Sequence, residues 1–522
     1  MKELINGAKL LEIEETVESK EKIVYLPAGA EKEILCVDGT HWRVRTVALH
    51  AFSDDSDTLI EEKESLLFAK GHKAPIEGNI FFLDNLLSRE SLFISSEAPD
   101  YVTSTLYVKN GLISLSNEKF AIAIGFDKTE NIERLCRSYY REAMINKIPR
   151  TMSNTWGDRN GYSRICRDFV LREIAAAKDI GVDIVQIDDG WQTGNTYDPA
   201  IKNEKGRRCF RGDFWEYGKE KFPGGMVEIA HAAKDSGLKL GIWFAPDSDE
   251  NYALIERDIA VLKKAYDEWG VRFFKLDMYW IESKENKEQF LKLLEAVYSF
   301  GDDAAVQLDV TRDKRINYLC GKEYGSIFVE NRYTKSTNAY PYRVLRSLWG
   351  FSKYLPTTRF QFELINPDLF KECYAENDVF APSLYGMDYL FASVMLSNPL
   401  FWMELQFLPQ SRREELVPVM KAWREIREDI ASSDISPVGE RPDGRSFTGF
   451  KVKGKDKSYL LVFRELTDRS SFSFDVGESV REVRTVISNV PVTATVGENV
   501  VTVNFGQPRA YALFEIKEDK NV

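Results

Sequence analysis

The sequence predicts a multidomain protein with a central (β/α)8 TIM barrel, flanked by an N-terminal β-sandwich and a small C-terminal β-domain. In the middle of the chain, near-continuous apolar runs alternate with amphipathic helical stretches, which is typical of a parallel sheet covered by helices. On both sides of this region, short segments alternate apolar with polar residues, as antiparallel strands with one solvated face do. The apolar runs end in acidic or aromatic residues, and in a barrel all these strand ends point to one place.

Eight candidate strands can be placed in the central region. Seven are the apolar runs at 151–155, 182–187, 238–242, 271–276, 304–308, 326–329 and 358–362. The candidate for the eighth is Val394–Leu396 followed by Asn398–Trp402. Amphipathic helices are expected between them, for example at 169–179, 225–236, 255–269 and 287–300, and a charged helix at 411–432 closes the region.

The flanking regions are predicted to be β-rich. Segments 22–26, 41–47 and 79–83 alternate apolar with polar residues, and a helix at 131–145 leads into the barrel. After the barrel, segments 459–463, 483–487 and 510–514 are strand-like. We therefore expect an N-terminal β-sandwich at 1–145, a barrel at 146–434 and a C-terminal β-sandwich at 435–522.

Composition narrows the classes of partner. The formal net charge of the 522-residue chain is -12, which argues against nucleic acid and against an anionic membrane surface. The N-terminal residues lack the apolar core of a signal peptide, and no apolar stretch approaches the length of a membrane span. The six cysteines have no short Cys-x-x-Cys spacing and are expected to be free thiols. These features predict a cytoplasmic protein that binds neither nucleic acid nor membrane.

Lys275 and Asp277 form the first candidate catalytic pair. They lie two residues apart at the end of a buried strand, so alternation places both side chains toward the barrel mouth. A nearby ammonium lowers the pKa of a carboxyl and keeps it ionised. An ionised carboxylate in a cleft is what a glycosidic nucleophile requires, although a buried structural ion pair has the same pattern.

The second candidate group consists of acids and indoles at other strand ends. Asp188 and Asp189 are adjacent, so only one of them can point inward along the strand. Paired carboxylates accept hydrogen bonds from sugar hydroxyls, and a flat indole offers an apolar face to a sugar ring. Either acid could instead be a helix cap, and a single Trp is more often a core residue, but three indoles at strand ends favour a sugar site. The indoles are those of Trp156, Trp191 and Trp243.

A retaining glycosidase needs a second, protonated carboxyl about 5 Å from the nucleophile. Asp309, Glu330 and Glu363 stand at later strand ends and are the candidates. The four histidines lie far apart, so neither a His-centred triad nor a His-rich metal site is supported. The sequence predicts no metal and no cofactor.

The ordered motifs between about 150 and 280 resemble those of glycoside hydrolase family 36, the melibiase-type α-galactosidases of clan D. They are Trp156, Asp188–Trp191, Phe222–Gly225, Gly241–Pro246 and Lys275–Met278. This resemblance implies that Asp277 is the nucleophile and that Lys275 binds substrate beside it. It further implies that Asp188 and Asp189 bind the hydroxyls that distinguish galactose, with Trp156, Trp191 and Trp243 lining the pocket. Family members often form dimers or tetramers, which implies a homo-oligomer.

The second half of the barrel departs from the family pattern. The Cys- and Gly-rich loop after the fifth strand is replaced by 307–315, which places Asp309 there. The family's acid/base Asp follows the sixth strand, where this chain has Glu330, Asn331 and Arg332. Glu330 is the natural substitute, and Arg332 is a candidate contact for the leaving group or a substrate anion. If Asn331 occupies the Asp position instead, the acid falls to Asp309, Asp313 or Glu363.

These observations predict a retaining α-glycosidase, most simply an α-galactosidase, with Asp277 and Glu330 as catalytic residues. The substrate would be a small or oligosaccharide α-glycoside. The altered fifth-strand loop motivates one alternative, a glycosidase of the same clan acting on another or modified sugar such as an α-N-acetylgalactosaminide. The uncertain acid position motivates another, a sugar-binding protein without catalysis. A metal-dependent barrel lyase or isomerase is disfavoured by the lysine beside Asp277.

Overall fold

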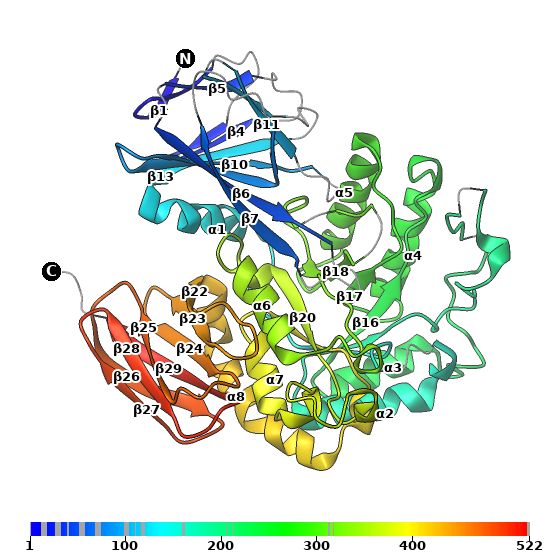
Figure 1. Cartoon of the computed structure of the whole chain (residues 1–522). Helices are drawn as coiled ribbons and strands as arrows, with labels where there is room; N and C mark the ends of the chain where they lie inside the picture. The colour runs from blue at the N-terminus through cyan, green and yellow to red at the C-terminus, as the bar shows by residue number, and fades with distance from the viewer. Residues whose placement is uncertain are drawn as a thin grey trace. The chain divides into compact units, whose positions relative to one another are not determined.

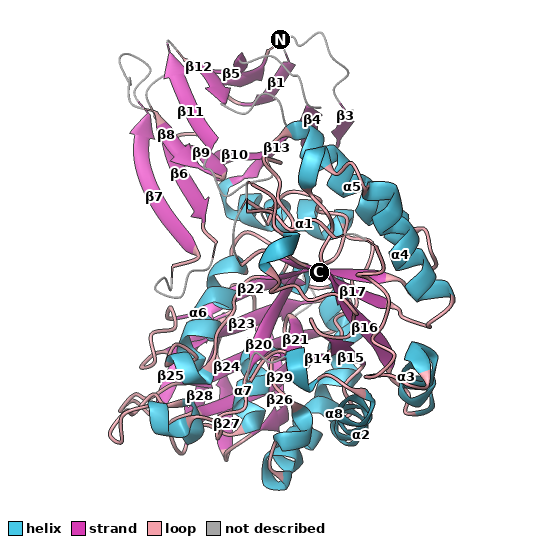
Figure 2. Ribbon diagram, turned by 90° about the vertical axis from the view of Figure 1, so that its right-hand side faces the viewer, coloured by secondary structure: helices cyan, strands magenta, loops and turns pink. Residues whose placement is uncertain are grey.

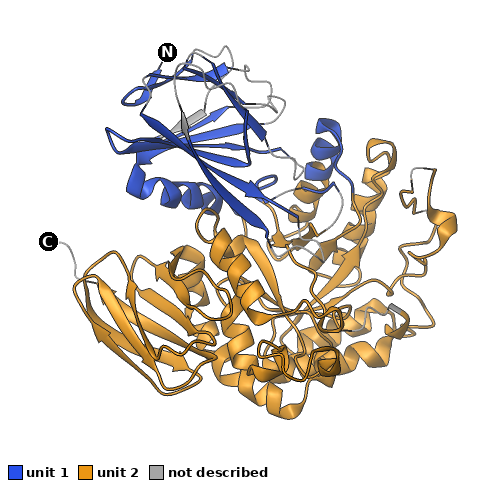
Figure 3. Ribbon diagram, in the orientation of Figure 1, with its two compact units in different colours: residues 1–144, 280–291, 312–323 blue, residues 145–279, 292–311, 324–522 orange. Residues whose placement is uncertain are grey.

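The computed structural model describes residues 2–11, 18–26, 33–38, 41–51, 58–67, 75–98, 104–109, 111–115, 121–158, 162–204, 206–210, 212–311, 314–316 and 318–518. The chain forms two compact units, each described here by itself (Figure 3). The first comprises Met1–Met144, Trp280–Leu291 and Arg312–Glu323, and the second comprises Ile145–Tyr279, Lys292–Thr311 and Tyr324–Val522. The three predicted domain ranges stay a prediction.

A closed barrel of eight parallel strands forms the centre of the second unit (Figure 1). Its strands pair in chain order, and the last closes on the first through Met152–Leu400. The strands are β14 (Met152–Asn154), β15 (Ile184–Ile187), β16 (Lys239–Phe244), β17 (Phe273–Leu276), β18 (Ala305–Asp309), β19 (Ser326–Phe328), β20 (Phe360–Leu364) and β21 (Asn398–Phe401). The predicted barrel is thus confirmed.

The predicted range of the eighth strand is only partly correct. β21 begins at Asn398, whereas Val394 ends a helix, α7 (Met387–Val394). Almost every side chain of α7 is buried, and its sequence is mostly apolar with no polar face. A short apolar run of this kind has no periodicity that separates a buried helix from a strand.

Helices cover the outside of the barrel, as the amphipathic stretches predict. They are α2 (Arg167–Ile180), α3 (Gly225–Asp235), α4 (Ile255–Asp267), α6 (Pro341–Phe351), α7 and α8 (Gln410–Ser432). Helix α5 (Lys284–Tyr298) is divided between the two units. Helix α2 shows how such a helix ends: Gly181 adopts φ 84° directly after it and feeds the chain into β15. Among the described residues, no helix is long and apolar enough to cross a membrane, and the predicted cytoplasmic location stays a prediction.

The barrel interior changes from apolar to polar along the strands. One end is filled by an apolar cluster that includes Met152, Ile184, Phe273 and Leu400. Further along the same strands, the residues two positions on include Asn154, Gln186 and Lys275, because every second side chain points inward. The polar side chains therefore gather toward the carboxyl ends of the strands, where barrel enzymes place their sites.

Two antiparallel sheets make up most of the first unit and enclose an apolar core (Figure 2). One sheet has the order β1 (Lys2–Ile5), β2 (Ala8–Leu10), β5 (Glu33–Val37), β12 (Leu112–Leu115), β11 (Ser104–Lys109), β8 (Ile76–Gly78). The other has the order β3 (Glu18–Lys20), β4 (Ile23–Leu26), β13 (Ile122–Lys128), β10 (Glu90–Ser96), β9 (Ile80–Asn85), β6 (Trp42–Leu49), β7 (Ile60–Leu67). Helix α1 (Ile132–Ala143) packs on β13.

Two further antiparallel sheets follow α8 in the second unit and share a core of aliphatic and Phe side chains. The larger has the order β22 (Asp434–Gly439), β23 (Phe447–Lys453), β24 (Ser458–Arg464), β29 (Ala510–Glu518), β26 (Val480–Ser488). The smaller has the order β25 (Ser471–Asp475), β28 (Val500–Phe505), β27 (Val492–Val496). Tyr389 of α7 packs against Phe463 and Tyr511, which joins these sheets to the barrel helices.

Candidate active site

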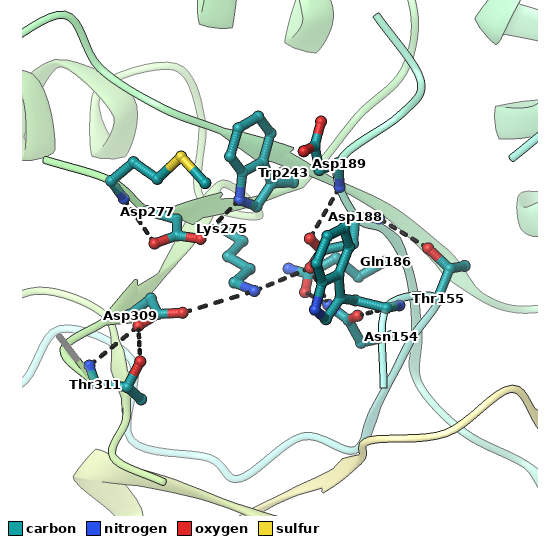
Figure 4. Close-up of polar contacts among 12 residues, drawn as sticks. Asn154, Thr155, Gln186, Asp188, Asp189, Trp243, Lys275, Asp277, Asp309 and Thr311 are labelled. Atoms are coloured by element: carbon teal, nitrogen blue, oxygen red, sulfur yellow. Dashed lines mark hydrogen bonds and ion pairs between the residues drawn. The ribbon is translucent and has the colours of Figure 1, made fainter. Parts of the chain in front are cut away.

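A buried ion-pair network lies at the carboxyl ends of β15, β17 and β18 (Figure 4). Lys275 Nζ lies 2.9 Å from Asp188 Oδ2 and 3.7 Å from Asp309 Oδ2. The ammonium also lies 5.0 Å from the centre of the Trp402 ring. Burial opposes its charge, but the attraction of Asp188, Asp309 and Asp277 outweighs burial and raises the pKa of Lys275. Lys275 is therefore charged at neutral pH.

Asp188 is held by donors from β14 and β17 and from the residue that follows it. Its Oδ2 accepts from Asn154 Nδ2 at 2.7 Å as well as from Lys275, and its Oδ1 accepts the backbone N–H of Asp189 at 2.8 Å. Its own N–H donates to Thr155 Oγ1 at 2.9 Å. The side chain points into the barrel mouth with a fixed orientation.

Asp277, the predicted nucleophile, follows β17 and is only partly buried. Its Oδ2 accepts from Trp243 Nε1 at 3.0 Å, and its Oδ1 accepts from the N–H of Met278 at 2.6 Å. Met278 adopts φ 54°, a left-handed conformation that aims its N–H back at the carboxylate. The two hydrogen bonds orient the carboxylate.

The ammonium of Lys275 makes its short ion pairs with Asp188 and Asp309, and Asp277 contributes a weaker attraction. The sequence predicts Lys275 beside Asp277 and does not identify its closer partners. Asp309 is in turn held by Thr311, whose N–H and hydroxyl both donate to Asp309 Oδ1, at 3.1 and 2.8 Å. Thus the lysine on β17 joins carboxylates from two other strands, β15 and β18.

Asp189 points away from its neighbour, toward the long segment that follows β15 (Figure 4). Its Oδ1 accepts from Gln192 Nε2 at 2.6 Å, and its Oδ2 accepts from the Thr196 hydroxyl. Burial raises the pKa of Asp189 to about 6, although these two donors oppose the rise. Of the two adjacent acids, Asp188 contacts Lys275 and Asp189 anchors the loop. Direct sugar contacts for Asp189 stay a prediction.

Glu330, Arg332 and Glu363 form a second buried network after β19 and β20. Arg332 Nε lies 2.9 Å from Glu330 Oε2, and Arg332 Nη2 lies 3.3 Å from Glu330 Oε1. The N–H of Arg332 donates to Glu363 Oε1 at 2.8 Å, whereas Glu363 Oε2 is buried with no hydrogen-bond partner among the described residues. Burial and the charge of Glu330 raise the pKa of Glu363 well above its usual value.

The three predicted indoles lie in different surroundings. Trp243 is buried and donates to Asp277. Trp156 is partly buried, and its Nε1 donates to the Tyr333 hydroxyl at 3.1 Å. Trp191 is fully buried, packs on Trp215 and Trp269, and donates to the Trp243 carbonyl at 2.8 Å. We infer a packing role for Trp191 in place of its predicted position in the pocket wall.

Asn154 and Trp402, which the sequence did not single out, belong to the site, as does Tyr333, a predicted contact for the leaving group or a substrate anion. Asn154 holds Asp188, and Trp402 lies against Lys275 at the end of β21. Tyr333 is partly buried and contacts Trp156 and Trp402. Burial raises the pKa of Tyr333, and the charges of Asp188, Asp309 and Glu363 raise it further. Trp402 could have been found, since it follows the eighth strand as Trp156 follows the first. Nothing in the sequence marks Asn154.

Asp313, the remaining alternative for the acid, lies outside the described residues. In the described part of the chain, no group of three or more His, Cys, Asp or Glu side chains is arranged to hold a metal ion. The site consists of fixed carboxylates, one buried ammonium and aromatic rings. Such a set can bind several hydroxyl groups and present a carboxylate to an electrophilic carbon.

The family model described as Melibiase matches residues 125–260. The α-galactosidase Mel36A of Lactobacillus acidophilus is 26% identical over 115 residues, which are 22% of this chain and 14% of that protein. An Escherichia coli α-galactosidase is 30% identical over 94 residues, which are 18% of this chain and 12% of that protein. The sequence matches therefore span only a small part of the length of these relatives.

The fold is similar over nearly the whole chain. The crystal structure of a variant of the family 36 α-galactosidase AgaA from Geobacillus stearothermophilus, in complex with raffinose, matches with a TM-score of 0.67 at 11% identity, covering 95% of this chain and 79% of that chain. An α-galactosidase from Lactobacillus brevis matches with a TM-score of 0.67 at 10% identity, covering 96% and 75%. The chain thus resembles the melibiase-type α-galactosidases in sequence over residues 125–260 and in fold along nearly all its length.

Proposed function

We propose that the protein is a retaining α-glycosidase, most simply an α-galactosidase, that hydrolyses terminal α-linked galactose from a small or oligosaccharide glycoside. The observation that carries this proposal is the fixed arrangement around Lys275 and Asp277. A charged lysine joins Asp188 and Asp309 at the bottom of the site, while the carboxylate of Asp277 is oriented by Trp243 and remains partly exposed. The similarity to α-galactosidases supports the choice of sugar.

In the proposed reaction, Asp277 attacks the anomeric carbon and forms a β-glycosyl-enzyme as the bond to the leaving oxygen breaks. The leaving oxygen takes a proton from a second carboxyl. That carboxyl then accepts a proton from water, whose oxygen attacks the anomeric carbon and releases Asp277. The sugar leaves with its α configuration retained. Lys275, Asp188 and Asp309 bind sugar hydroxyls throughout, and Trp156 and Trp243 line the pocket.

The sequence assigns the second carboxyl to Glu330. Both Glu330 oxygens accept N–H groups of Arg332. Glu363 has the opposite surroundings, a buried unpartnered oxygen and a raised pKa that favours the protonated acid. β17 and β20 are the fourth and seventh strands of the eight-stranded ring, and Asp277 and Glu363 both stand at the carboxyl ends of their strands. The contacts thus favour Glu363 over Glu330 as the proton donor, with Glu330 kept in place by Arg332.

The test is turnover of p-nitrophenyl α-galactoside by the wild type, Asp277→Ala, Glu330→Gln and Glu363→Gln, with and without azide. The Asp277 variant should lose activity by several orders of magnitude, and azide that attacks the substrate directly from the vacated face should yield β-galactosyl azide. The variant of the true acid/base should be rescued by azide and yield α-galactosyl azide, because azide attacks the β-glycosyl-enzyme with inversion and needs no general base. Glu465→Gln, which alters a buried carboxyl in the C-terminal sheets, is the matched control and should keep full activity.

The outcomes separate the alternatives. Activity on another α-glycoside but not on galactosides would retain the mechanism and replace the sugar, as the altered loop at Asp309 would allow. Binding of galactosides without any turnover would support a sugar-binding protein. Azide rescue of Glu330→Gln but not of Glu363→Gln would return the acid/base role to Glu330. An assembly into dimers or tetramers stays a prediction of the family resemblance.

A further inference from the structure

We propose that Tyr197, together with Trp156, forms the surface on which the leaving group of the glycoside stacks, and that its natural occupant is the second sugar ring of an oligosaccharide. This inference rests on the proposed function, because it concerns the part of the substrate beyond the terminal sugar. Neither sequence motifs nor the reaction itself require Tyr197. Its position and exposure are the basis of the proposal.

The loop that carries Tyr197 is tied directly to the candidate site. The Thr196 hydroxyl donates to Asp189, and the Thr196 carbonyl accepts from Arg208 Nε at 2.9 Å. The N–H of Tyr197 donates to Asn195 Oδ1 at 2.9 Å. The backbone before the ring is therefore held on both sides, although the loop itself is largely exposed.

Tyr197 lies within electrostatic range of the acids that serve the sugar. Burial of its hydroxyl raises the pKa of Tyr197 to about 12, and the negative charges of Asp189, Asp188 and Asp277 contribute to this rise. The contact of Thr196 with Asp189 and the ring pair of Tyr197 with Trp156 place the ring beside the candidate site.

The ring of Tyr197 is parallel to that of Trp156. Their planes differ by 5° and their centres are 6.5 Å apart. Trp156 is fixed by the hydrogen bond from its indole to Tyr333, so the pair presents rings of one orientation. Parallel aromatic faces suit the flat apolar face of a pyranose ring, which needs C–H groups against a ring and hydroxyls toward water.

The exposed fractions of the side chains indicate which sugar of the substrate Trp156 and Tyr197 would contact. Lys275, Asp188 and Asp309 are at most 5% exposed, whereas Tyr197 is 46% exposed. A terminal sugar that reaches the buried ion pairs must have the rest of the molecule on the solvent side. The ring of Tyr197 is on that side, and so it contacts the leaving group rather than the terminal galactose.

The experiment measures binding to the inactive Asp277→Asn protein by calorimetry. The two ligands are methyl α-galactoside, whose leaving group is a single methyl, and an α-galactosyl trisaccharide. Tyr197→Ala in this background should raise the dissociation constant of the trisaccharide about tenfold, the loss expected for one ring-stacking contact. It should leave the methyl glycoside within about twofold. Tyr197→Phe should behave as the parent, since the ring remains.

Phe407→Ala is the matched control, because Phe407 is a similarly exposed ring, 50%, that has no place in the site. It should change neither dissociation constant. Equal weakening of both ligands by Tyr197→Ala would overturn the proposal and assign the ring to the terminal sugar or to the loop. Binding of both ligands with no effect of Tyr197→Ala would overturn this proposal alone. Failure of the Asp277→Asn protein to bind either ligand would overturn the proposed function as well.

Discussion

Lys275 Nζ lies 2.9 Å from Asp188 Oδ2, and this ion pair joins the fourth strand of the barrel to the second. The strand between them carries Trp243, whose indole reaches Asp277. Lys275 thus pairs closely with Asp188, which is far away in sequence, and only weakly with Asp277, two positions further on. The Asp277 carboxylate accepts from the Trp243 indole and the Met278 N–H. The charge of Lys275 therefore stabilises the barrel as well as serving the proposed binding of substrate.

Replacing Lys275 should destabilise the barrel strongly. Lys275→Met leaves the buried carboxylates of Asp188 and Asp309 without their cation, which should lower the free energy of unfolding by roughly 3–5 kcal/mol. Lys263→Met is the matched control, since its pair with Asp267 lies exposed on a helix and contributes at most about 0.5 kcal/mol. Urea-induced unfolding followed by tryptophan fluorescence measures both, and wild-type stability of Lys275→Met would contradict this account of the network.

The indole N–H of Trp243 should matter for turnover more than for stability. Trp243→Phe keeps a ring but removes the donor to Asp277, and the loss of a hydrogen bond to a charged group should lower kcat/KM roughly tenfold to hundredfold. Trp191→Phe removes an indole donor to a backbone carbonyl, so it should cost about 1 kcal/mol of stability and leave kcat/KM within about threefold. Steady-state kinetics on an aryl α-galactoside separates the two variants. Similar losses of kcat/KM in both would argue against a specific role for the Trp243 donor.

Asp189 should make stability depend on pH. Its pKa in the folded protein, about 6, lies above the value of about 4 expected for an unfolded chain. The favourable contribution of such a carboxyl is fully present below about pH 4 and is lost as the pH rises through 6. Asp189→Asn cannot ionise at this position. Between pH 4 and pH 7.5, the free energy of unfolding of the wild type should therefore fall by about 3 kcal/mol relative to that of the variant. Unfolding by urea at these two pH values measures the difference, and a pH-independent difference would show that Asp189 does not titrate in this range.

The backbone at Met278 should be sensitive to β-branched residues. Its φ of 54° is costly for most residues and especially for those branched at Cβ. Met278→Val should therefore shift the N–H that donates to Asp277 Oδ1 and lower kcat at least about tenfold. Met278→Gly fits the left-handed conformation and should retain more of kcat than the valine variant. The order of these two variants in kcat is the result to check, and the reverse order would contradict a requirement for this backbone conformation.

Local patterns were sufficient for the barrel. Apolar runs with helical stretches between them predicted seven strands, and all seven lie where expected to within a few residues. The start of the eighth strand was predicted too early, because α7 is mostly apolar and its last residues have the pattern of a buried strand. The alternating segments at both ends correctly indicated antiparallel sheets.

Side-chain partners across the barrel could not be predicted in the same way. Alternation along β17 correctly placed Lys275 inward, but it gave no means of ranking Asp188, Asp309 and Asp277 as partners of the ammonium. Likewise, a Trp directly after a strand can face the pocket or the core. Trp191 turns into an aromatic cluster because the loop after β15 folds Trp215 against it.

The sequence by itself determined the parallel barrel, the flanking sheets and the concentration of acids and indoles at the strand ends. These follow from hydrophobic periodicity, which is a local property of the chain. Only the tertiary structure decided that Lys275 pairs with Asp188, that Asp189 holds the loop of Tyr197, and that burial raises the pKa of Glu363. The reason is physical: burial and the distances between charges on different strands set these properties, and both arise only when the strands close into a barrel.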